Sequence, residues 1–157
     1  MKAATIQEIK QEVAGLKPAQ LTELCMRLAK FKKENKELLT YLLFEAQDEE
    51  QYIRTIKEEI AELMGDINLG QLYYAKKSLR KIGRIINKYA RYSNQKTTEV
   101  ELRMFFLSSI KTLGIPIKRN TVINNLYLGQ LKKVNALVDA LHEDLQYEYR
   151  RSIDALD

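Results

Sequence analysis

The sequence of 157 residues is short of the residues on which several kinds of protein chemistry depend. It has one cysteine, one histidine, two prolines, six glycines and no tryptophan. The lone Cys25 cannot form a disulfide within the chain, and a single thiol is typical of proteins that stay in a reducing compartment. We therefore expect a cytoplasmic protein that folds without disulfides.

Long hydrophobic runs are missing as well. No stretch approaches the roughly 18 consecutive apolar residues that a membrane-spanning helix needs. The first fifteen residues, MKAATIQEIKQEVAG, lack the apolar run of a signal peptide. The sequence therefore predicts a protein that is neither secreted nor inserted in a membrane.

The scarcity of histidine and glycine limits the catalytic sites that this chain can build. With His142 as the only histidine, metal sites with two histidines need a second chain. Phosphate-binding loops of the G-x-x-x-x-G-K-[ST] and G-x-G-x-x-G types are absent. Asp139 and His142 have the spacing of a metal half-site on a helix, but we interpret His142 as a solvated surface residue. Cys25 lies beside Leu24 and Met26 without a glycine-rich turn, so we interpret it as a buried, inert thiol. We predict that the protein is not an enzyme and has no cofactor or metal site.

Most of the sequence shows the periodicity of amphipathic helices. Hydrophobic residues make up 45% of the chain and charged residues 30%, which suffices for one core. Alternating runs typical of strands are short and interrupted, whereas apolar residues recur at helical spacing between the glycines and prolines. We therefore predict an all-α fold of six to seven antiparallel helices in a single domain, residues 1–157. The predicted helices cover about 5–15, 18–31, 37–46, 49–64, 71–92 and 97–113, followed from about 119 by one helix or by two with a bend near Gly129.

Two further features of the helices can be predicted. Capping boxes are indicated by Thr5 with Glu8 and by Thr98 with Glu101, and the segment 37–46 is apolar over most of its circumference, which predicts a central position. Short connections favour antiparallel packing of sequence neighbours. The alternatives are a short α-α superhelix of stacked helical hairpins, which we favour, and an irregular bundle.

Charge is distributed in blocks along the chain. Residues 45–66 carry eight acidic side chains and two basic ones, whereas residues 67–96 carry eight basic side chains and no acidic one. On a helical wheel of residues 71–92, seven cations fall within an arc of about 140° opposite the apolar residues. These seven residues, which we call the basic stripe, are Lys76, Lys77, Arg80, Lys81, Arg84, Lys88 and Arg91.

Like charges three or four residues apart destabilise a helix by a few tenths of a kcal/mol per pair, so we expect an anionic group to offset them. One interpretation is intramolecular, through the acidic residues of the preceding helix. Those residues are Glu58, Glu59, Glu62 and Asp66. The other interpretation is an anionic partner, either an acidic protein surface or a phosphate backbone. Tyr73, Tyr74 and Tyr92 lie in or beside the stripe and offer planar faces for stacking on bases. Packing at the helix border also explains these tyrosines, and it is the interpretation that we favour.

The run YYAKKSLRKIGRIINKYARYS, followed by TTEVELRMFFLSSIKTLG, resembles small all-helical proteins of Bacteroidetes-type bacteria. This similarity covers residues 73–114, with some further likeness around FKKENKELLTYLLFEA. The resemblance implies a cytoplasmic bacterial protein of unassigned function. It implies no catalytic residues.

These observations favour a non-catalytic helical interaction module that presents a charged surface to an acidic protein partner. The alternative is nonspecific binding of nucleic acid through helix 71–92. Acidic segments precede and follow the basic one, whereas nucleic-acid-binding proteins usually keep a whole face basic. Self-association between the +8 segment of one copy and the −6 segment of another is also compatible with the sequence, while binding to a membrane surface ranks last because the apolar face of the helix is needed for the core.

Overall fold

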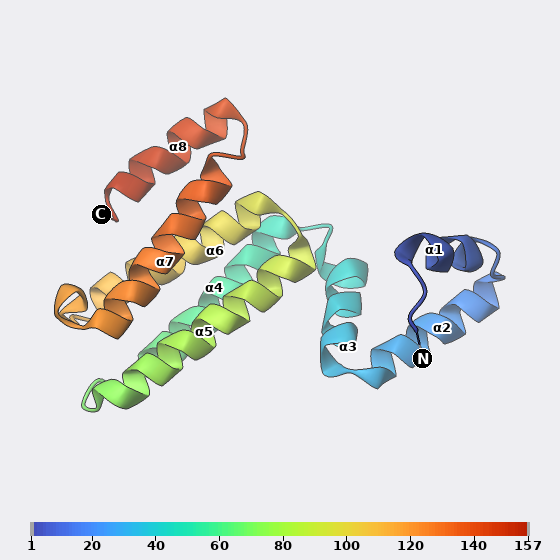
Figure 1. The fold of residues 1–157 in the computed structure, drawn as a ribbon, viewed down its shortest axis with the longest axis horizontal. Coiled ribbons are helices and arrows are strands. Elements are labelled where there is room, and N and C mark those ends of the chain that lie inside the picture. The colour runs from blue at the N-terminus through green and yellow to red at the C-terminus, as the bar shows by residue number, and fades with distance from the viewer. Residues whose placement is uncertain (1, 157) are drawn as a thin grey trace. The chain divides into compact units, whose positions relative to one another are not determined.

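The computed structural model describes residues 2–156 of the chain, and within them every regular element is helical. The prediction of an all-α fold is therefore confirmed at this level. The elements in chain order are α1 (Ile6–Ala14), α2 (Pro18–Phe31), α3 (Lys33–Thr40), the π-helical segment η1 (Tyr41–Glu45), α4 (Glu49–Gly65), α5 (Leu72–Ser93), α6 (Lys96–Thr112), the 3-10 segment η2 (Ile117–Arg119), α7 (Thr121–Val138) and α8 (Glu143–Asp154) (Figure 1). The described residues thus contain eight α-helices, more than the six to seven predicted.

The extra helix arises at the C-terminal end, where the sequence left open one helix or two with a bend near Gly129. The structure has two helices, but the chain does not bend at Gly129. α7 continues through Gly129 because Gln130, Leu131 and Val134 are buried on its inner face. The chain instead breaks after Val138, and a new helix, α8, begins at Glu143. A break in this position lets α8 turn back and pack against α7.

The chain divides into two compact units, residues 1–44 and residues 45–157. A single domain stays a prediction. The second unit holds the apolar core. In it α4, α5, α6 and α7 run antiparallel to their neighbours in the chain (Figure 1), and α6 contacts all three of the others.

α6 is the central helix of the second unit. Val100, Leu102, Phe106, Leu107 and Ile110 are fully buried on it. These residues point to more than one side of the helix, because α6 has neighbours on several sides. Burial of side chains of this size contributes about 1.5–3 kcal/mol each to the free energy of unfolding, so α6 organises the packing on which α5 rests.

The first unit differs because α1, α2 and α3 contain no buried residue. The prediction that segment 37–46 is central is wrong, since Leu42, Leu43 and Phe44 are 57%, 58% and 76% exposed. A segment that is apolar all round needs neighbours on every side, and within this unit α2 is the helix that packs on α3. Cys25 on α2 is partly exposed rather than buried.

The starts of α1, α2 and α4 agree with local signals in the sequence, whereas the start of α6 does not. The capping box of Thr5 with Glu8 is present, Pro18 occupies the first turn of α2, and Asp48 caps α4. The second predicted capping box is wrong, because α6 begins at Lys96 and the buried Thr98 hydroxyl donates a hydrogen bond to Glu49 of α4.

Candidate basic surface on helix α5

On α5 the apolar residues and the cationic residues lie on opposite faces, and the apolar face packs against the rest of the unit. Its buried residues lie at helical spacing on one side of the helix. They are Ala75, Leu79, Ile82, Gly83, Ile86, Ala90 and Ser93. The helix ends at Asn94, which adopts a left-handed conformation with φ 56° and donates its N–H to the Ala90 carbonyl. The tertiary packing of one face therefore orients the other face, which carries the basic stripe, toward solvent.

The basic stripe is solvent-accessible along the whole helix. Its exposed members are Lys77, Arg80, Lys81, Arg84 and Arg91, and its half-buried members are Lys76 and Lys88. The structure thus keeps all seven predicted residues on the outer side of one helix.

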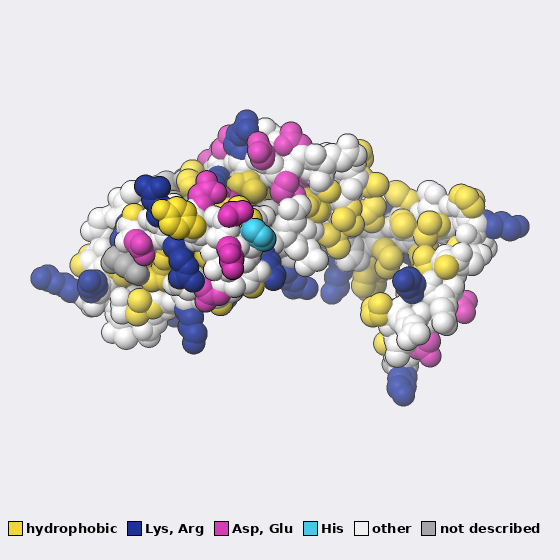
Figure 2. All heavy atoms as spheres, turned by 90° about the horizontal axis from the view of Figure 1, so that it is seen from above, with side chains coloured by type: hydrophobic (Ala, Val, Ile, Leu, Met, Phe, Trp, Pro, Cys, Tyr) yellow, Lys and Arg dark blue, Asp and Glu magenta, His cyan; other side chains and the backbone are white. Residues whose placement is uncertain are grey.

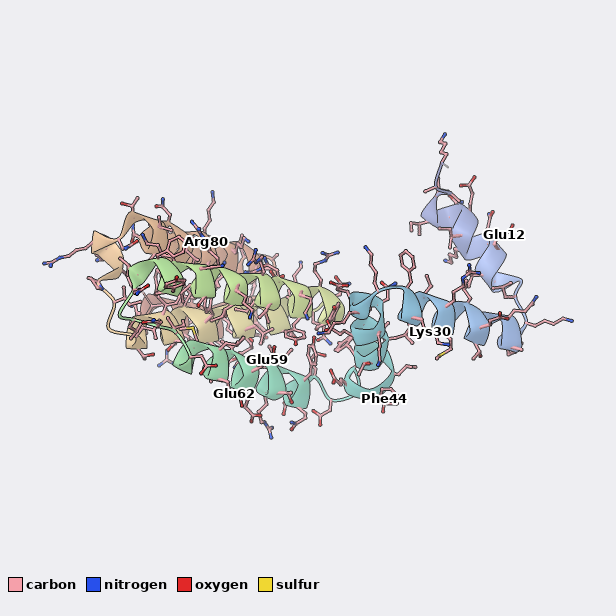
Figure 3. The ribbon with its side chains drawn as sticks, turned by 90° about the horizontal axis from the view of Figure 1, so that it is seen from below. Glu12, Lys30, Phe44, Glu59, Glu62 and Arg80 are labelled. Atoms are coloured by element: carbon pink, nitrogen blue, oxygen red, sulfur yellow. The ribbon has the colours of Figure 1, made fainter. Side chains whose placement is uncertain are left out.

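Among the described residues, the acidic side chains of α4 form no ion pair with the six stripe residues other than Lys88. Within residues 2–156, no carboxylate lies within ion-pair distance of any stripe residue other than Lys88. The Lys88 ammonium is 4.7 Å from the centroid of the Tyr89 ring, a cation–π arrangement. Figure 3 shows Arg80 on α5 and Glu62 on α4, lying on different sides of the helix pair.

The carboxylates near α5 have other roles. Glu59 of α4 accepts a hydrogen bond of 2.7 Å from the Tyr89 hydroxyl, and Lys57 of α4 forms its own ion pair with Glu101 of α6 at 2.7 Å. Glu58, Glu62 and Asp66 are exposed. The stripe residues other than Lys88 therefore keep their positive charge without an ion-pair partner among residues 2–156.

Two tyrosines continue the stripe at the N-terminal end of α5. Tyr73 is 71% exposed and Tyr74 is 50% exposed, and their rings meet edge to face at 5.4 Å between centroids. Tyr92, at the other end, is half-buried and contacts the Tyr89 ring edge to face at 6.1 Å. Tyr73 and Tyr74 thus offer ring faces to a ligand, whereas Tyr92 is engaged in packing.

The tertiary structure adds cations that were not predicted as site residues. A crevice of about 610 Å³ lies among α5, α6 and α7, and its lining includes Arg91 of the stripe, Lys96 and Lys133. Lys96 donates to the Ala140 carbonyl at 3.3 Å. Lys96 and Lys133 are 37 residues apart in the sequence, so only the packing of α7 beside α5 and α6 joins them to the stripe.

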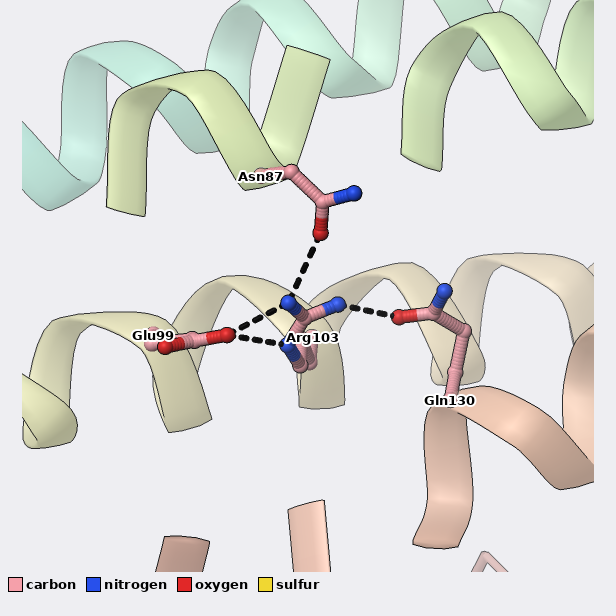
Figure 4. A network of polar contacts seen from close by, with 4 residues as sticks. All are labelled: Asn87, Glu99, Arg103 and Gln130. Carbon is pink, nitrogen blue, oxygen red and sulfur yellow. Dashed lines mark hydrogen bonds and ion pairs between the residues drawn. The ribbon is translucent and has the colours of Figure 1, made fainter. Parts of the chain in front are cut away.

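A polar network around Arg103 (Figure 4) contributes Asn87, Glu99 and Arg103 to the lining of the same crevice. The Arg103 guanidinium is 3% exposed. It pairs with Glu99 and donates to the side-chain oxygens of Gln130 and of Asn87, the latter at 2.8 Å. Because its donors are engaged, Arg103 joins α5, α6 and α7 as a structural residue. The exposed cations of the lining that a ligand can reach are Arg91, Lys96 and Lys133.

The candidate residues for metal and thiol chemistry lie outside this surface. His142 is exposed and its ring nitrogen caps α8, while Asp139 pairs with Arg150 at 2.6 Å. Residues 2–156 contain no group of three or more histidine, cysteine, aspartate or glutamate residues that could hold a metal ion. In the same range, no helix is both long enough and apolar enough to cross a bilayer.

No family model, curated protein or solved structure matches this chain.

Proposed function

We propose that the protein is a non-catalytic helical interaction module that binds an acidic surface of a partner protein through the basic stripe of α5. The observation that carries this proposal is the exposed stripe whose charge is left without intramolecular ion pairs at all positions except Lys88. Uncompensated like charges on one helix face cost free energy in the unbound protein. A partner that supplies carboxylates recovers that free energy and gains electrostatic steering on approach.

The extent of the basic surface supports a macromolecular partner. Lys96 and Lys133 widen it beyond one helix at its C-terminal end, so a ligand that follows the stripe contacts side chains from α5, α6 and α7. The acidic helix α8 belongs to the same unit, and its exposed Glu143, Asp144 and Glu148 disfavour a long polyanion that covers the whole unit. A partner with a localised acidic patch suits this distribution better.

The second candidate function is nonspecific binding of nucleic acid, and the exposed Tyr73 and Tyr74 favour it. Aromatic rings next to a cationic groove are a common platform for unpaired bases. Under this alternative the phosphates follow the stripe, and the bases stack at the N-terminal end of α5.

Fluorescence anisotropy separates these functions. The labelled probes are an acidic peptide of twelve or so glutamates interspersed with serine, single-stranded RNA and double-stranded DNA, each titrated with the full chain at several salt concentrations. We expect the Arg80→Glu/Arg84→Glu variant to bind the acidic peptide at least tenfold more weakly, because two attractive contacts become repulsive. Tight binding of RNA or DNA that weakens steeply with salt, together with no binding of the acidic peptide, would favour nucleic-acid binding over an acidic protein partner.

The matched control is Lys118→Glu/Arg119→Glu, which changes the net charge equally at two exposed cations of η2. We expect it to retain binding within about twofold, allowing for the long-range effect of net charge. An equal loss in both variants would show that net charge rather than the stripe attracts the peptide, and would refute the proposal.

The contacts of α2 with α3, α4 with α5 and α6 with α7 are those of three helical hairpins, and stacking of the hairpins into an α-α superhelix stays a prediction. So do the absence of catalysis, the cytoplasmic location and the resemblance of residues 73–114 to small bacterial helical proteins.

A further inference from the structure

The N-terminal unit has large hydrophobic side chains on its surface. Among residues 2–44, ten large hydrophobic residues are exposed, and they lie on α1, α2 and η1. Figure 2 shows hydrophobic side chains at the surface of the molecule. The exposed residues are Ile6, Ile9, Leu21, Leu24, Met26, Leu28, Phe31, Leu42, Leu43 and Phe44. A surface of this kind in a monomer usually marks a binding site.

Part of this surface is hollowed into a groove within the unit. The groove encloses about 570 Å³ between α2 and α3–η1, and its apolar lining comes from both sides. The apolar residues are Met26, Ala29, Leu39, Leu43 and Phe44. Met26, Leu43 and Phe44 are 51%, 58% and 76% exposed, so these side chains are accessible to a ligand. Figure 3 labels Lys30 on α2 and Phe44 in η1, which stand on the two walls.

The turn between α2 and α3 holds the walls of the groove together. α2 ends at Phe31 and α3 begins at Lys33, so a single residue joins them. The Asn35 side chain donates a hydrogen bond of 2.9 Å to the Leu28 carbonyl, which bridges the turn. These contacts within the turn shape the groove. A ligand bound in it adds the apolar burial that α1, α2 and α3 lack.

The rim of the groove is cationic. Lys30, Lys32, Lys33 and Lys36 belong to its lining, which includes no acidic residue among the described residues. Lys33 forms an i, i+4 ion pair of 3.6 Å with Glu37 on the same face of α3, and its side chain stays 85% exposed. Glu34 is exposed outside the groove. An apolar floor with a lysine rim fits a ligand with an apolar stripe flanked by carboxylates.

We propose that this groove is a second docking site, which binds an acidic amphipathic helix of a partner protein. Such a helix inserts its apolar residues at i, i+3, i+4 and i+7 between α2 and α3–η1, and its flanking glutamates or aspartates meet the four lysines. The groove shares no residue with the basic stripe, so this proposal does not depend on the function proposed for α5.

The test uses a labelled 18-residue peptide with leucines on one helical face and glutamates on the other, and a second peptide with lysines in place of the glutamates. In anisotropy titrations of the full chain, we expect the Leu/Glu peptide to bind at least tenfold more tightly than the Leu/Lys peptide. The Leu43→Asp/Phe44→Asp variant should lose at least tenfold in affinity for the Leu/Glu peptide. Lys32→Glu/Lys36→Glu should reverse the preference between the two peptides. Absence of saturable binding, or equal affinity for both peptides, would overturn the proposal.

Two controls locate the binding. Ile9→Asp/Lys10→Glu makes the same kinds of change at exposed residues of α1 outside the groove, and we expect affinity within twofold of the unmodified chain. Arg80→Glu/Arg84→Glu on α5 should also leave this affinity unchanged. If either control weakens binding as much as the groove variants do, the peptide does not occupy the groove and the proposal fails.

Other occupants of the groove give different results. A dimer seen by light scattering that dissociates in Leu43→Asp/Phe44→Asp would assign the groove to a second copy of the chain. Co-sedimentation with phosphatidylserine vesicles that the same variant abolishes would assign it to an anionic lipid surface. Either outcome, without preferential binding of the Leu/Glu peptide, would overturn the proposal of a helical partner.

Discussion

At the scale of single residues, Arg103 shows how a charge is kept inside the helical unit. Its guanidinium is held by the Glu99 carboxylate and by the amide oxygens of Asn87 and Gln130. Such a network stabilises the fold only while every member is present, because removing one partner leaves a buried polar group unpaired. The residues come from α5, α6 and α7, so the network also specifies how these helices meet.

We expect Arg103→Ala to lower the free energy of unfolding by about 3 kcal/mol, since it breaks a buried ion pair and leaves a cavity. Urea denaturation followed by circular dichroism measures this loss. Arg80→Ala on the exposed stripe is the control and should change stability by about 0.5 kcal/mol or less. A loss below about 1 kcal/mol in Arg103→Ala would contradict a structural role for the network.

Tyr149 of α8 links stability to pH. Burial raises the pKa of Tyr149 to about 12, with further contributions from the charge of Glu101, a hydrogen bond to that carboxylate and the charge of Glu148. The neutral phenol is therefore favoured in the folded chain. Its contribution to stability is fully present below pH 10, the ordinary value of the unfolded chain, and is lost as the pH rises from 10 toward 12.

Tyr149→Phe removes this titration, so we expect the variant to lose less stability than the unmodified chain between pH 10 and 12. The measurement is the urea midpoint at several pH values in that range. Tyr147→Phe, at a residue of α8 that is 72% exposed, provides the matched control. Parallel curves for the unmodified chain and Tyr149→Phe would show that the buried phenol does not contribute to the alkaline loss.

At the scale of elements, the basic stripe of α5 has two interpretations, an internal salt-bridge element and a docking surface, which predict different effects of charge reversal. An internal salt-bridge element would lose stability on charge reversal, whereas a docking surface would not. The structure places no carboxylate in ion-pair distance of Arg80 or Arg84 within residues 2–156. Reversal of both charges instead relieves repulsion with neighbouring cations of the stripe.

For Arg80→Glu/Arg84→Glu we therefore expect a melting temperature that is unchanged or slightly higher at low salt, and equal to that of the unmodified chain at high salt, where such interactions are screened. Differential scanning calorimetry at two salt concentrations tests this. A melting temperature that falls only at low salt would show that the acidic residues of α4 neutralise the stripe at longer range.

At the scale of the whole molecule, burial is divided unevenly between the two units. The buried hydrophobic residues lie in residues 45–156 with the exception of Tyr41, and α1, α2 and α3 contribute none. Helices as short as these are marginal in water unless tertiary packing supports them. The second unit thus holds nearly all of the apolar burial that stabilises a fold.

We expect a fragment of residues 45–157 to unfold cooperatively with a melting temperature within a few degrees of the full chain. A fragment of residues 1–44 should show low helicity and no cooperative transition. Far-ultraviolet circular dichroism against temperature measures both. A large loss of stability in the longer fragment would support the single domain predicted from the sequence.

The sequence by itself determined the helical class, most helix boundaries and the basic stripe of α5. These features depend on residues close together in the chain: glycine and proline between helices, caps such as Asp48, and cations three and four residues apart. Local conformational preference and helical periodicity suffice for them.

Only the tertiary structure decided which helix is central, where the C-terminal helices divide and which charges meet. Segment 37–46 and α6 are both apolar on several sides, but only α6 has neighbouring helices that cover its apolar sides. The periodicity of a segment does not show how many helices pack against it. Helix packing places Lys96 and Lys133 beside the stripe and brings the Thr98 hydroxyl to Glu49, to which it donates a hydrogen bond. The residues that meet in this way are tens of positions apart in the sequence. Contacts of this kind depend on the register of packed helices, which local sequence patterns do not contain.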